Sequence, residues 1–181
     1  MKGILFNLAE EVVSTAFGAG VWDDLLDAAG VEGAYTTLGN YADAEFTALV
    51  GAAVAVMELP EGEVVRFIAR GAIPLLAQRF PEFFDPHTAT ETFVLTLNEI
   101  IHPEVRKLYP GADVPEFDFD HSPEGELLVT YRSARKLCAL ADGFIQGAAG
   151  HYGESVTVDH DRCMHRGDPA CEMRCSFTRA A

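Results

Sequence analysis

Residues 116–135 read EFDFDHSPEGELLVTYRSAR, and within this stretch the sequence changes from helical periodicity to the period of a β-strand. The alternation of acidic and aromatic residues over Glu116–Asp120 predicts a strand with one buried and one solvated face. Ser122-Pro123-Glu124-Gly125 is typical of a turn, and residues 126–133 are the expected return strand. Because helical patterns precede and follow this hairpin, the sequence predicts an α+β fold with an antiparallel sheet.

Apolar residues recur at helical spacing over most of the first hundred residues. Pro74 is expected to kink the fourth of these stretches, and His102-Pro103 is expected to end the fifth. The expected helices cover residues 5–17, 19–29, 43–57, 62–79, 90–102 and 134–149, and the last strands cover residues 153–159 and 170–177. We therefore expect one domain over residues 1–181, with a mostly helical N-terminal lobe (1–60) packed on an α+β C-terminal lobe (61–181).

The chain of 181 residues has the length of one globular domain with enough core to enclose a ligand. Its net charge of -15 argues against nucleic-acid and anionic-membrane binding, since both need a cationic surface. The N-terminus lacks the pattern of a signal peptide, and the longest apolar run, residues 48–57, is too short to span a membrane. These features predict a cytoplasmic protein without nucleic-acid or membrane partners.

Tyr131, Ser133 and Arg135 alternate along the expected second strand, so they would share one face of it. Two hydroxyls and a guanidinium in a row suit the binding of a carboxylate or a phosphate. The alternative is an ordinary solvated strand face.

His102 lies near the end of a mostly apolar helical stretch and is followed by Pro103. A histidine in such a place can bind a metal through one ring nitrogen while the other donates a hydrogen bond. The alternatives are a core histidine and a histidine that caps the end of the helix.

Several motifs occur together in this sequence, namely MKGILFN at residues 1–7, His102, LYPGA at residues 108–112, Pro115 and the Tyr131/Ser133/Arg135 row. In this order and spacing they resemble the haem-nitric oxide/oxygen binding (H-NOX) family of gas-sensor domains, over essentially the whole chain. The resemblance implies that haem b lies between the two lobes, with His102 as the axial ligand of its iron. It also implies that the row holds the haem propionates and that Pro115 presses on the porphyrin and distorts it.

The resemblance places a mostly apolar distal pocket on the gas-binding side of the haem. Relatives that hold O2 have a tyrosine at the position of Leu140, whereas NO needs no hydrogen-bond donor. The amide of Gln78 is a candidate donor in this pocket. The implied distal residues are Leu5, Ala9, Pro74, Gln78, Leu140 and Phe144.

These features favour a sensor that binds NO, and also CO, at ferrous haem, excludes O2 and is not an enzyme. Nucleophile and phosphate-loop motifs are missing from the sequence. The resemblance implies that the signal passes to a partner, either a histidine kinase or a cyclic-di-GMP enzyme. A haem enzyme such as a peroxidase is a further alternative, but it would need a polar distal acid and base.

The cysteines carry a second hypothesis. Their spacings, together with His160, permit a tetrahedral zinc site. Some H-NOX proteins bind zinc through a similar set, which corresponds here to Cys138, His160, Cys163 and Cys171, with Cys175 as an alternative to Cys138. Because thiolates are oxidisable, the alternative function is a thiol/zinc redox switch that regulates a signalling partner.

Overall fold

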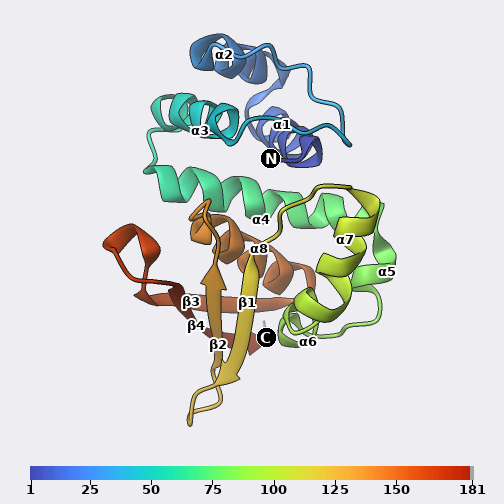
Figure 1. Ribbon diagram of the computed structural model, residues 1–181, viewed down its shortest axis with the longest axis vertical. Helices are drawn as coiled ribbons and strands as arrows, with labels where there is room; N and C mark the ends of the chain where they lie inside the picture. The colour runs from blue at the N-terminus through green and yellow to red at the C-terminus, as the bar shows by residue number, and fades with distance from the viewer. Residues whose placement is uncertain (180–181) are drawn as a thin grey trace.

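The computed structural model describes residues 1–179, so the last two residues of the predicted domain lie outside the described part. Its first three helices form a small bundle of α1 (Gly3–Phe17), α2 (Ala19–Ala29) and α3 (Asp43–Met57). The bundle buries Phe6, Trp22, Leu25 and Phe46 against the upper side of α4 (Glu61–Arg79). Figure 1 shows this bundle above α4, with the rest of the chain below it.

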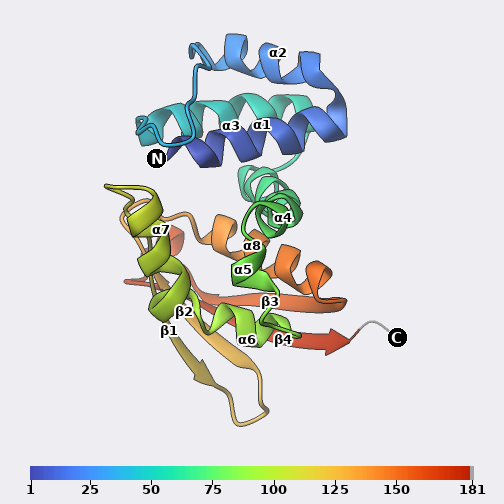
Figure 2. The same ribbon diagram turned by 90° about the vertical axis from the view of Figure 1, so that its right-hand side faces the viewer.

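Helix α4 lies in the middle of the molecule and packs along α8 (Cys138–His151). Two glycines of α8 make the contact close, because a Cβ on Gly143 would lie 2.6 Å from the carbonyl oxygen of Arg66 and one on Gly147 would lie 2.7 Å from that of Arg70. Pro74, inside α4, has no N–H for the Arg70 carbonyl, so this carbonyl is free to face α8. Figure 2 shows the resulting layers of helix bundle, α4, α8 and sheet.

Within residues 1–179, four strands form an antiparallel sheet in the order β1-β2-β4-β3. They are β1 (Glu116–His121), β2 (Leu127–Arg132), β3 (Glu154–Arg162) and β4 (Cys171–Arg179). Inward-facing residues of the alternating strands, such as Phe117, Val129 and Met173, form the lower core together with α8. The predicted α+β fold with an antiparallel sheet is confirmed, and β1 pairs with β2 as a hairpin.

The segment between α4 and β1 is broken into short helices. These are α5 (Pro81–Phe84), α6 (Thr90–Val94), the π-helical turn η1 (Leu97–Ile101) and α7 (His102–Leu108), and a 3-10 turn, η2 (Met164–Arg166), follows β3. The prediction that the helix ends at His102-Pro103 is wrong. The π-turn makes hydrogen bonds five residues apart, including one from the N–H of Ile101 to the carbonyl of Thr96 at 3.1 Å. Pro103 then lies in the first turn of α7, where its missing N–H costs little.

No helix within residues 1–179 combines the length and the apolar character needed to cross a membrane.

The close contact of α4 with α8 can be tested by adding a single methyl group. We expect Gly143→Ala to lower the free energy of unfolding by about 1–3 kcal/mol, because the new Cβ would overlap the main chain of Arg66. Gly150→Ala, on the same helix with nothing within 4 Å of its Cβ position, is the control and should be neutral or stabilise by up to ~1 kcal/mol. Urea unfolding curves measure both, and equal effects of the two variants would contradict the packing described here.

Candidate functional site

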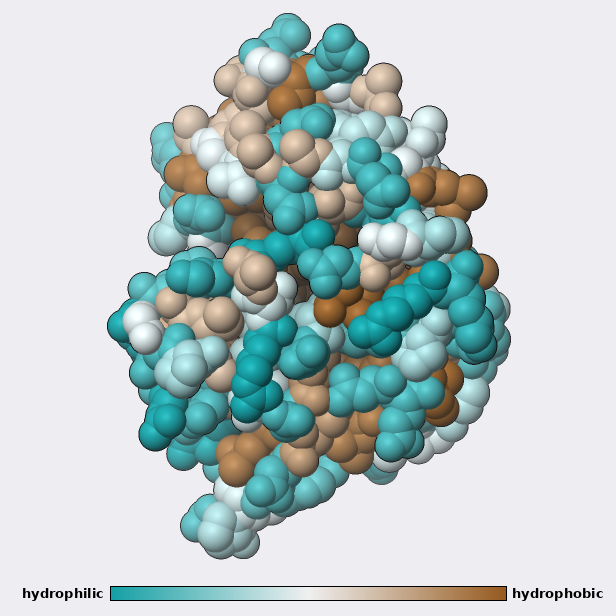
Figure 3. Space-filling view, in the orientation of Figure 1, coloured by the Kyte–Doolittle hydropathy of each residue, from teal (hydrophilic) through white to brown (hydrophobic). Residues whose placement is uncertain are grey.

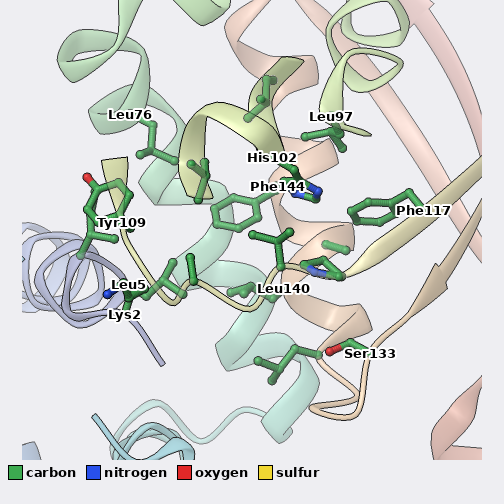
Figure 4. A pocket seen from close by; sticks show the side chains of 18 of the residues that line it. Lys2, Leu5, Leu76, Leu97, His102, Tyr109, Phe117, Ser133, Leu140 and Phe144 are labelled. Atoms are coloured by element: carbon green, nitrogen blue, oxygen red, sulfur yellow. The ribbon is translucent and has the colours of Figure 1, made fainter. Parts of the chain in front are cut away.

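A cavity of about 350 Å³ lies where α1, α4, α7, α8 and the β1–β2 hairpin meet. Its wall is mostly aliphatic and aromatic, and this volume is in the usual range for a small-molecule or cofactor site. On the face shown in Figure 3, apolar side chains are visible in the recess between the helix bundle and the lower part of the molecule. Figure 4 shows side chains from these separate elements pointing into one space.

His102 lines this cavity from the first turn of α7. Burial, with a smaller contribution from the charge of Arg106, lowers the pKa of His102 from 6.5 to about 4. The ring is therefore neutral at physiological pH, which is the form that binds a metal. Its nitrogens make no hydrogen bond to the rest of residues 1–179, so they are available to a ligand inside the cavity.

Phe117 and Pro115 line the cavity beside His102. The Phe117 ring stacks on the His102 ring, with 5.7 Å between ring centroids and 28° between ring planes, and it contacts Tyr131 edge-on. Asn98 of η1 donates a hydrogen bond of 2.6 Å to the carbonyl of Phe117. The turn that precedes His102 is thereby joined to β1.

Tyr131, Ser133 and Arg135 all line the cavity, but they do not form the predicted strand row. Strand β2 ends at Arg132, and the chain then turns, with the backbone N–H of Arg135 donating to Ser133 Oγ at 3.2 Å. The Tyr131 hydroxyl accepts a hydrogen bond from the N–H of Leu137 at 2.9 Å, and burial raises the pKa of Tyr131. The three side chains are thus brought together by a strand end and a turn.

Arg135 holds two carboxylates at the edge of the cavity. Its Nε donates to Asp43 Oδ2 at 2.7 Å, and its Nη1 donates to the carbonyl and Oδ2 of Asp113 at 2.6 and 3.0 Å. Burial opposes ionisation of Asp43, but hydrogen bonds from the N-terminal ammonium and Arg135 outweigh it and lower the pKa of Asp43. The Nη2 group of Arg135 has no acceptor within residues 1–179, so it retains two donors for a further carboxylate.

The distal residues expected from the sequence divide into two sets. Leu5, Leu140 and Phe144 line the cavity. Ala9, Pro74 and Gln78 do not, so placing them in the pocket was wrong. Ala9 is buried in the N-terminal bundle, whereas Pro74 and Gln78 are both exposed.

The helical phase of α4 explains the two exposed residues. Ile73 and Leu76 face the cavity, and Pro74 and Gln78, four residues apart, share a different face. Gln78 therefore supplies no hydrogen-bond donor to the cavity.

The lining fits the haem that the sequence resemblance implies. A porphyrin needs an extended apolar cavity, a neutral imidazole for its iron and donors for two propionate carboxylates. The cavity provides the His102 imidazole, whose nitrogens have no hydrogen-bond partner within residues 1–179, apolar walls from several helices, and hydroxyl and guanidinium donors at the Tyr131–Arg135 turn.

The sulfur atoms of Cys138, Cys163 and Cys171 lie within 4.8 Å of one another, and none of these three residues lines the cavity. Burial raises the pKa of the Cys138 and Cys171 thiols. Burial also opposes ionisation of Cys163, but hydrogen bonds from the His165 N–H and the neighbouring thiols outweigh it and lower the pKa of Cys163.

The other two residues of the zinc hypothesis lie outside this cluster. His160 Nε2 is 3.1 Å from Oδ2 of the buried Asp142, which also accepts a 2.5 Å hydrogen bond from Arg66. Cys175 is buried further along β4, opposite Leu127 and Val158, so it does not replace Cys138. The structure thus brings together three of the expected ligands.

Sequence reasoning missed several residues of the site. Lys2, Tyr109 and Phe117 line the cavity, and Asp43 holds Arg135 from another lobe. The inward phase of the β1 alternation was a usable signal for Phe117. The sequence holds no such signal for Lys2 and Asp43, because each looks like an ordinary charged surface residue.

Comparison with known proteins agrees with this geometry. The model of the haem-NO-binding family matches residues 2–160. The chain is similar to an H-NOX protein from S. oneidensis in the Fe(II)NO ligation state, at 29% identity and a TM-score of 0.91, covering 99% of this chain and 100% of that one. An H-NOX from Shewanella woodyi in the Fe(II)CO ligation state is 27% identical, with a TM-score of 0.81 and coverage of 99% and 95%.

An Fe(II) unliganded H-NOX protein from K. algicida shares the fold at 21% identity, with a TM-score of 0.86 and coverage of 99% and 98%. None of the curated proteins matches the sequence. Because the family model spans most of the sequence, the chain belongs to the haem-NO-binding (H-NOX) family.

Proposed function

We propose that this protein is a haem-based sensor of nitric oxide, with His102 as the axial ligand. The observation that carries the proposal is the neutral His102 imidazole in an apolar cavity whose far end offers the donors of Tyr131, Ser133 and Arg135. Relatives at 29% identity have been solved with NO and with CO on ferrous iron, which supports the same ligands here.

Haem, when bound, supplies a ferrous iron that takes up a diatomic gas. His102 would hold the iron from α7, and the Phe117 ring would fix the plane of the imidazole by stacking on it. The free donors of Arg135, with Tyr131 and Ser133, would orient the propionates. Pro115 would press on the porphyrin from the loop before β1, as the family resemblance implies.

Exclusion of O2 is part of the proposal. Bound O2 carries partial negative charge and is stabilised by a hydrogen-bond donor, whereas NO is not dependent on one. Leu5, Leu140 and Phe144 offer none, and Gln78 lies outside the cavity. The apolar distal wall therefore favours NO over O2.

The response would be read by a partner rather than by chemistry within this chain. A change at His102 would be passed on through α7, which contacts both the N-terminal bundle and the η1 turn before it. A histidine kinase or a cyclic-di-GMP enzyme is the proposed partner class, and the proposed location is the cytoplasm.

The axial ligand can be tested with His102→Ala. We expect this variant to bind haem more than about tenfold more weakly and to lose the absorption spectrum of five-coordinate ferrous haem, with recovery on addition of free imidazole. His165→Ala, at an exposed histidine outside the cavity lining, should keep the wild-type spectrum. An unchanged His102→Ala spectrum would falsify the assignment.

Gas selectivity can be tested with Leu140→Tyr. The new hydroxyl would face the cavity and donate to bound O2, so we expect O2 affinity to rise about tenfold or more. Leu140→Phe adds the ring without the hydroxyl and should not stabilise O2. Absorption spectra of the reduced proteins in air and then with NO measure the effect, and a stable O2 complex of the wild type would contradict the proposed selectivity.

The three-cysteine cluster favours a second candidate function, a thiol/zinc redox switch that regulates the same partner. Three thiols within 4.8 Å of one another provide three ligands of a tetrahedral zinc site. His160 would have to leave Asp142 to become the fourth ligand.

Metal analysis of the purified protein tests this second function. We expect about one zinc per chain, lost in Cys163→Ser and on thiol oxidation, but retained in Cys175→Ser, because Cys175 lies outside the cluster. If the wild-type protein purified under reducing conditions contained no zinc, the zinc-switch proposal would be rejected, and the haem-sensor proposal would be unaffected.

A further inference from the structure

Lys2 is the one basic residue among the first 65 of the sequence, and it is buried, with 8% of its surface exposed. Its ammonium meets no carboxylate within residues 1–179. It donates instead to two main-chain carbonyls, those of Leu38 at 3.1 Å and Pro110 at 2.9 Å. Burying an ammonium lowers the stability of the fold unless its donors are paired. These two hydrogen bonds therefore strongly constrain the positions of the Leu38 and Pro110 carbonyls.

The two acceptors belong to different parts of the fold. Leu38 lies in the segment between α2 and α3, which also pairs with the start of the chain through the Lys2–Asn40 bridge. Pro110 follows α7, the helix that begins with His102. Figure 2 shows α7 between the N-terminal segment and the sheet, and Figure 4 shows Lys2 beside Leu5 and Tyr109.

Helix α7 depends on contacts at its ends. It has seven residues, too few to be stable alone. Its first turn follows the η1 turn, which Asn98 fastens to the carbonyl of Phe117. At the other end, Tyr109 packs on Ile4 and Leu8 of α1. The hydrogen bond from Lys2 to Pro110 adds a polar contact with the N-terminal lobe at that second end.

We propose that Lys2 is a positioning residue that ties α7, and with it His102, to the N-terminal lobe. The inference rests on the proposed function, since it concerns the axial ligand. The ammonium fixes the end of α7 relative to the 36–40 segment and so fixes the tilt at which the His102 ring enters the cavity. The same bond carries any displacement of α7 into the N-terminal lobe.

The test compares Lys2→Met, which keeps the aliphatic stem and removes the ammonium, with Lys107→Met. Lys107 lies on α7 itself, has a side chain that is 70% exposed and pairs with Glu104, so it is a matched control. We expect Lys2→Met to speed hydrogen exchange about tenfold or more at two amides, the Gly39 N–H, which bonds to Thr36, and the Ala112 N–H, which bonds to Tyr109. Lys107→Met should leave both unchanged.

A spectroscopic measurement separates positioning of His102 from a merely structural role. In the reduced, haem-loaded protein, we expect Lys2→Met to shift the iron–histidine stretching band in resonance Raman spectra, and Lys107→Met to leave it in place. Unchanged exchange in Lys2→Met overturns the link between the lobes. Faster exchange with an unmoved band overturns the positioning of His102.

If Lys2→Met does not fold, NMR of the wild type decides, because the proposal requires one of the three lysine ammonium signals to be protected from solvent exchange and coupled to the Leu38 and Pro110 carbonyls. If the purified protein takes up no haem, the proposed function fails, whereas the amide-exchange result still decides whether Lys2 joins the lobes.

Discussion

The close approach of α4 and α8 is the contact on which the rest of the structure depends. It is possible because Gly143 and Gly147 carry no side chain where the main chain of α4 passes. With the two helices this close, Ile73 and Leu76 of α4 and Leu140 and Phe144 of α8 line the same cavity. The helix bundle rests on one side of this pair and the sheet on the other, so the glycines set both the thickness of the molecule and the width of its ligand site.

Much of this arrangement follows from periodicity and motif spacing. The bounds of α2 and α3 coincide with the predicted helices, and the β1–β2 hairpin lies where alternation begins, because these signals are local. Tyr131, Ser133, Arg135 and His102 line one cavity, although the first three lie on a strand end and the turn after it and not on one strand face.

The remaining features depend on contacts between residues that are distant in the sequence, and local sequence patterns do not predict such contacts. Pro74 and Gln78 were misplaced because the rotation of α4 is set by its neighbours and not by its own sequence. A helix covers Pro103 because this residue lies in the first turn of α7, directly after the π-turn, where an N–H has no partner within the helix. His160 is held by Asp142, a carboxylate on another element, and the partners of Arg135 come from α3 and from the loop before β1.

Strand β1 is an edge of the sheet, and unpaired strand edges invite pairing with other chains. Here Asn98 already occupies the carbonyl of Phe117, and the outward residues Glu116, Asp118 and Asp120 are all acidic. A second molecule that added a strand at this edge would have to displace η1 and bring like charges together. The segment that presents His102 therefore also protects the protein from aggregation, so a change that freed it would promote self-association as well as alter the ligand site.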